Sequence, residues 1–153
     1  MIWTKKMIQS ELQRLDGITG LKGARLPIHI TAEKRTLGSF QHTKDGEPLR
    51  FSFSTYYLDD PEFSRAQAYD LIRHEYAHYM DVCRRGTSDH GPHWKACCQE
   101  LGEDLDRCFS PLLNRFRLAL ERDEPLDSML YELIPFLDDP EANQPKRRKK
   151  SAA

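Results

Sequence analysis

The sequence predicts an α+β fold, in which a small three-stranded antiparallel sheet packs against one long helix and further helices follow toward the C-terminus. Three stretches between residues 26 and 57 alternate apolar and polar side chains, as half-buried strands do. From residue 66 onward, apolar residues recur at the spacing of a helix. Strands followed by helices, rather than alternating with them, are typical of the α+β class.

Composition predicts one folded domain with polar ends. The chain has 153 residues, a net charge of −1, 39% hydrophobic and 31% charged residues. We expect a domain over residues 1–137, with a helical C-terminal extension, and a disordered basic tail over residues 138–153. No apolar run approaches the ~20 residues that span a bilayer, and residues 1–6 do not resemble a signal peptide. These features predict a cytoplasmic protein without membrane association; they do not predict an oligomeric state.

The four cysteines do not form a recognisable metal or redox motif. Cys83, Cys97, Cys98 and Cys108 contain no Cys-x-x-Cys pair, so a zinc ribbon and a dithiol redox site are both excluded. We expect reduced thiols, some of which serve as small core residues.

The first part of the chain predicts one helix and three strands. Residues 4–16 have helical spacing at Ile8, Leu12 and Leu15, with Gly17 as the stop. Strands are expected over residues 26–32, 37–40 and 49–57, the last two joined by an Asp-Gly turn at residues 45–46. The polar face of the first strand carries His29, which we expect at the surface.

The second part of the chain predicts helices. A long one covers residues 66–85, with acidic residues at 59–62 before it and Gly86 after two arginines as its stop. A proline at position 92 starts the next helix. Two more are expected: one over residues 109–120, with an inward face of Leu112, Leu113, Phe116 and Leu120, and one over residues 126–137.

Two histidines and a glutamate in the long helix form the pattern His-Glu-x-x-His. His74 and His78 are four residues apart, so they lie on one face of the helix and can bind a single ion. Glu75 lies beside the pair, where it can reach a water on the ion without being a ligand. This is the helix of zincin-type peptidases, with two zinc ligands and a general base.

A catalytic zinc site needs a third protein ligand, for which the sequence offers four candidates. His90 lies in the loop that opens the next helix, and His93 follows in its first turn. Glu100 and Glu103 are carboxylates at plausible separation. We favour His90, because Gly91 beside it permits close approach of the backbone to the site.

The pattern His-Glu-Tyr-Ala-His, a short loop and then His-Gly-Pro-His-Trp-Lys resembles the SprT-like zinc proteins, which include the Spartan proteases that degrade proteins crosslinked to DNA. The resemblance covers roughly residues 5–105. It implies zinc held by His74, His78 and His90, with Glu75 as the catalytic glutamate. Many members carry a cysteine-rich zinc ribbon after this core, but residues 106–153 contain only Cys108.

The resemblance implies a zinc metallopeptidase, a hydrolase that cleaves protein substrates through a zinc-activated water and can act on DNA-associated proteins. The basic block at residues 146–150 is either a solvated tail or a contact with nucleic acid. The alternative function is a non-catalytic zinc-binding adaptor for nucleic acid or protein. Asp81 could orient a ligand histidine or be an exposed carboxylate. Tyr56, Tyr57 and Tyr79 could stabilise an oxyanion or simply pack.

Overall fold

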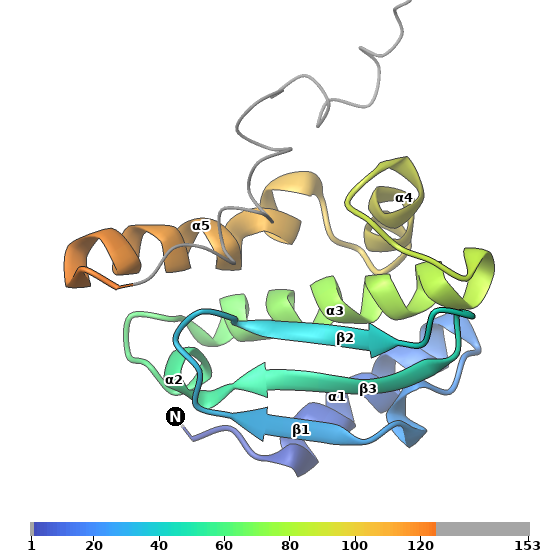
Figure 1. Ribbon diagram of the computed structural model, residues 1–153, viewed down its shortest axis with the longest axis horizontal. Helices are drawn as coiled ribbons and strands as arrows, with labels where there is room; N and C mark the ends of the chain where they lie inside the picture. The colour runs from blue at the N-terminus through green and yellow to red at the C-terminus, as the bar shows by residue number, and fades with distance from the viewer. Residues whose placement is uncertain (1, 125–153) are drawn as a thin grey trace, which may run out of the picture.

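The computed structural model describes residues 2–124 and has a mixed α+β architecture centred on helix α3 (Figure 1). The elements in chain order are α1 (Lys5–Thr19), the 3₁₀ turn η1 (Gly23–Arg25), β1 (Ile28–Thr31), β2 (Gly38–His42), β3 (Pro48–Ser54), α2 (Thr55–Leu58), α3 (Arg65–Arg85), α4 (Pro92–Glu100) and α5 (Leu105–Arg122). Helix α3 contacts the sheet and α1 on one side and α4 and α5 on the other. The expected helix over residues 126–137 and the tail over residues 138–153 lie outside the described residues.

The three strands were located correctly, but the prediction of a purely antiparallel meander is wrong. The strand order is β1-β3-β2, with β2 antiparallel and β1 parallel to β3. Residues 32–37 pass around the end of β3, where side chains of Ser54, the last residue of the strand, and of Tyr57 bind their carbonyls. The Oγ of Ser54 donates to Glu33 O (2.6 Å), and the Tyr57 hydroxyl donates to Lys34 O (2.7 Å). These contacts place β1 on the far edge of β3 instead of next to β2.

Helix boundaries differ from the predictions where a better cap lies nearby. Helix α1 continues past Gly17 and ends at Gly20, whose φ of 80° is the left-handed conformation of a C-cap. Helix α3 begins at Arg65, one residue before the predicted start, and Ser64 caps it in a capping box with Gln67. Gly86 ends α3 as predicted, with φ 78°. The third strand stops at Ser54, so that residues 55–57 belong to α2.

Aromatic side chains join α3 to the sheet. The ring of Tyr76 stacks on Phe51 with an interplanar angle of 2°, and Tyr79 meets both Phe40 and Phe51 edge-on. Phe51 and Phe53 are fully buried and lie on the same face of β3, as their alternation predicts, whereas His29 on β1 is exposed. This core fixes one side of α3, so that its opposite side faces α4 and α5.

Helix α5 covers the other side of α3 with most of the predicted face, since Leu112 is buried and Leu113 and Phe116 pack against the core. Cys108, Phe109, Leu112 and Arg115 are buried, whereas Leu120 is 59% exposed, so its inward assignment is wrong. The helix begins at Leu105 instead of residue 109, with Asp104 as its N-cap. Among residues 2–124, no helix has the length and apolarity needed to cross a bilayer.

Candidate metal centre

Three imidazoles from two segments meet between α3 and the loop that precedes α4. Nε2 of His90 lies 3.2 Å from Nε2 of His78 and 3.3 Å from Nε2 of His74. Three nitrogens held tetrahedrally about 2.05 Å from one zinc ion would lie about 3.3 Å apart. The observed spacing therefore fits three ligands of one metal ion, and these histidines are the group of close ligand atoms found in residues 2–124.

Hydrogen bonds on the far side of two rings direct their Nε2 atoms toward the common centre. Nδ1 of His74 lies 2.9 Å from the carbonyl oxygen of Cys108. Because a carbonyl only accepts, this Nδ1 carries the proton and the neutral ring keeps a lone pair on Nε2. Nδ1 of His78 similarly lies 2.7 Å from Oγ of Ser88. Such partners orient metal-binding histidines and select their tautomer.

Burial keeps the three rings neutral. It lowers the pKa of His74 to about 3, with repulsion from His90 adding to the effect. Burial also lowers the pKa of His90 to about 4 and that of His78 well below its ordinary value. Neutral imidazole is the form that binds a metal, so the site needs no proton release from these rings at neutral pH.

Glu75 lies beside the cluster and is 3% exposed. One of its carboxylate oxygens, Oε2, is 4.0 Å from Nε2 of His74. The side chain thus comes close to the centre without joining the three close nitrogens, which is the relation expected from its place one residue after His74.

Two aromatic rings that we did not assign to the site form its wall. Trp94 is fully buried, stacks on His78 with centroids 5.2 Å apart, and donates from Nε1 to the backbone oxygen of His74 (3.2 Å). Phe109 of α5 lies 6.0 Å from the ring of His90. From the sequence, we predicted both only as apolar residues of helices. Trp94 could have been assigned to the site because it follows His90 by only four residues.

The other candidates for the third ligand lie elsewhere. His93 is exposed in the first turn of α4. Glu100 makes a two-pronged ion pair with Arg84, at 2.7 and 2.9 Å, on the surface between α3 and α4. Glu103 is buried and binds Arg73 at 2.8 Å.

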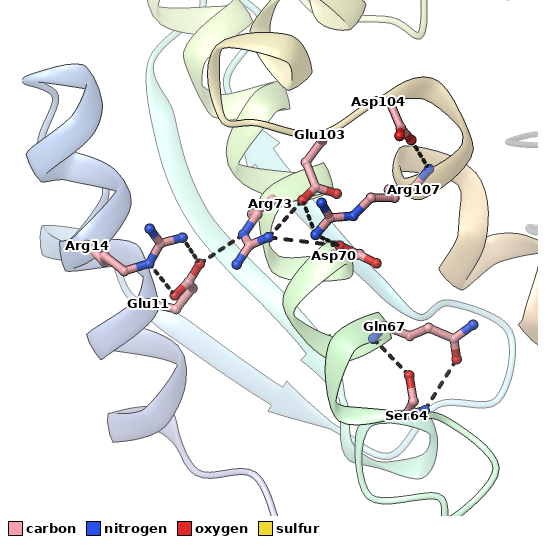
Figure 2. A network of polar contacts seen from close by, with 9 residues as sticks. All are labelled: Glu11, Arg14, Ser64, Gln67, Asp70, Arg73, Glu103, Asp104 and Arg107. Atoms are coloured by element: carbon pink, nitrogen blue, oxygen red, sulfur yellow. Dashed lines mark hydrogen bonds and ion pairs between the residues drawn. The ribbon is translucent and has the colours of Figure 1, made fainter.

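Glu103 belongs to a partly buried ionic network that joins α1, α3 and α5 (Figure 2). Arg73 of α3 bridges Glu11 of α1 (3.1 Å) and Glu103, and Arg107 of α5 contacts both Asp70 (3.2 Å) and Glu103 (3.3 Å). Burial raises the pKa of Glu103 to about 7, against the attraction of Arg73 and with a further contribution from Asp70. Burial also disfavours the ionised form of Glu11, but hydrogen bonds from arginines leave its pKa below the ordinary value.

The remaining predicted contributors have other roles. Asp81 is buried, not exposed, and it pairs with Arg85 instead of touching a histidine. The hydroxyls of Tyr56 and Tyr57 bond Glu124, and that of Tyr79 accepts from the backbone of residue 22. The tyrosines therefore pack and bond within the fold.

Comparisons with protein-family models, curated proteins and solved structures found no match to this chain.

Proposed function

We propose that this protein is a zinc-dependent metallopeptidase of SprT-like type, in which Glu75 acts as the general base for peptide-bond hydrolysis. The observation that carries the proposal is the convergence of three Nε2 atoms, 3.2 and 3.3 Å apart, next to a buried carboxylate.

The donor set favours zinc over the other common divalent ions. Imidazole nitrogens suit zinc, whereas magnesium and calcium prefer oxygen ligands. Structural zinc sites use four protein ligands, and catalytic sites use three with one position left for water or substrate. The three histidines of the described residues match the second pattern. A purely structural site would also have no use for Glu75, which favours the peptidase over the adaptor.

The residues of the chain have distinct tasks in this mechanism. When bound, zinc lowers the pKa of a water ligand toward neutrality and polarises the peptide carbonyl. Glu75 takes the proton from the attacking water and delivers it to the departing amine. Cys108 O and Ser88 Oγ hold two ligand rings in position, while Trp94 keeps water from the inner side of the cluster.

The substrate class follows from the resemblance to the SprT-like proteins. We propose protein substrates, including proteins associated with DNA. The basic block at residues 146–150, which lies outside the described residues, is the segment that we propose for contact with nucleic acid.

The test is the variant Glu75→Gln, with Glu100→Gln as its matched control. Both should retain one zinc per chain by elemental analysis. Glu75→Gln should lose peptide hydrolysis by at least about 100-fold, because it removes the proton acceptor, whereas Glu100→Gln should retain it. Activity that survives in Glu75→Gln would refute the mechanism. A zinc-loaded wild-type protein that cleaves no unfolded or DNA-crosslinked protein would favour the adaptor.

A further inference from the structure

The loop between α3 and α4 does more than carry His90, because it also reaches back to His78. Ser88 lies two residues before His90, and its Oγ is 2.7 Å from Nδ1 of His78. The tautomer of a histidine is set by the hydrogen bond that its second nitrogen makes. Ser88 therefore stands where it can decide which nitrogen of His78 carries the proton.

The direction of this hydrogen bond follows from the second partner of Ser88. The Ser88 hydroxyl has two acceptors within reach. One is the backbone oxygen of Asp89, at 3.5 Å; the other is the buried carboxylate of Asp81, whose pKa is held below its ordinary value, against burial, by hydrogen bonds from Arg85 (2.6 and 2.7 Å) and from Ser88. A carboxylate and a carbonyl oxygen both only accept, so Ser88 donates its proton to one of these two groups. Its lone pairs then accept the Nδ1 proton of His78, which leaves Nε2 of that ring free to bind a metal.

Arg85 joins this relay to the segment around His90. Its Nη2 lies 3.5 Å from Oδ1 of Asp89, and the same oxygen accepts from the backbone N–H of Gly91 at 2.8 Å. Asp89, the residue before His90, thus binds the backbone of Gly91, the residue after it. Asp89 also contacts Arg85, the arginine that pairs with Asp81.

We propose that Ser88 and Asp81 are positioning residues that fix the Nδ1–H tautomer of His78, and that Arg85 couples this relay to the loop that carries His90. The inference rests on the metal site of the proposed function. It adds that two of the three ligands, which come from different segments, are oriented through one shared arginine.

The test compares Ser88→Ala with the conservative variant Ser88→Thr and with Thr87→Ala, a change at an exposed neighbour in the same loop. The first measurement is nitrogen-15 NMR of the histidine rings in metal-free protein. We expect the Nδ1–H form of His78 in the wild type and a shift toward the Nε2–H form in Ser88→Ala. The tautomer of His74, held by Cys108 O, should not change.

The second measurement is zinc affinity by competition with a chromogenic chelator. Ser88→Ala should bind about 10–100 times more weakly than the wild type, whereas Ser88→Thr and Thr87→Ala should stay within a few-fold. A wild-type tautomer or a wild-type affinity in Ser88→Ala would overturn the inference while leaving the proposed function intact. If the wild-type chain binds no zinc, the proposed function fails, and the positioning role falls with it; the tautomer experiment still decides whether the hydrogen-bond relay exists.

Discussion

Because of Glu103, the stability of the wild type should fall as the pH rises toward 7, and replacing Glu103 by glutamine should remove this dependence. A carboxylate in a simple salt bridge would have the opposite effect, since it stabilises the fold only once it is ionised. Glu103 is 2% exposed, and burial raises its pKa to about 7 although Arg73 lies 2.8 Å away. Glutamine has nearly the same shape and resembles the protonated acid, so the variant keeps the neutral form at every pH.

The magnitude follows from proton linkage. Between the ordinary pKa of glutamic acid, about 4.5, and the folded value, about 7, folded Glu103 holds a proton that the unfolded chain has lost. This contribution is complete below about pH 4.5 and disappears as the pH rises through 7. The wild type should therefore lose about 1 kcal/mol of unfolding free energy per pH unit, and at most about 3 kcal/mol over the whole window, relative to Glu103→Gln.

The assay is urea unfolding of both proteins, followed by circular dichroism, between about pH 3 and about pH 8. All other titrating groups are common to the two chains and cancel in the difference. Glu100→Gln is the control, since Glu100 is an exposed residue whose pKa is lowered by its hydrogen bond from Arg84. A difference that stays constant with pH, or that grows only below pH 4.5, would show that Glu103 acts as an ordinary ionised partner of Arg73.

Three further predictions concern the site and the turn at Gly46, which lies against Gly86 at the end of α3. His90→Ala should weaken zinc binding by more than about 100-fold, measured by chelator competition, because it removes a ligand. Gly46→Ala should lower the free energy of unfolding by about 2–3 kcal/mol in urea unfolding, because φ at this position is +85° and the new Cβ would lie 2.7 Å from Cα of Gly86. Gly86→Ala is the control: its φ is +78°, but no atom lies within 4 Å of the new Cβ, so it should cost only about 1 kcal/mol. Trp94→Leu should lose about 3 kcal/mol in the same assay, because it opens a cavity and removes the donor to His74 O; a loss below about 1 kcal/mol would contradict this role.

Local patterns predicted the elements of this fold but not the order of its strands. Alternation in residues 49–55 and the spacing of Ile8, Leu12 and Leu15 reflect burial of one face, which each segment encodes by itself. The parallel pairing of β1 with β3 depends instead on where the segment after β1 is held. That position is set by hydrogen bonds from Ser54 and Tyr57 to carbonyls more than twenty residues earlier in the chain, which no periodicity reveals.

The candidate site divides in the same way. His74, Glu75 and His78 are placed by one helix, so their spacing alone predicted their arrangement. His90 was also indicated, because it follows on a short loop. The partners that orient the rings were not predicted, since Cys108 contributes only a backbone oxygen, which every residue has, and Ser88 is a common loop residue. The burial of Glu103 could not be predicted either, because it depends on ion pairs with arginines from α3 and α5.

The hydrogen bond between His74 and the carbonyl oxygen of Cys108 limits how far the chain can be truncated from its C-terminus. The three histidines and Glu75 all lie before residue 91, and the resemblance to the SprT-like proteins ends near residue 105. A truncated chain that stopped there would possess every proposed ligand and still lack the acceptor for His74 and the ring of Phe109. The minimal unit that can be excised therefore extends into α5, and a shorter fragment should carry the motif without a properly oriented first ligand.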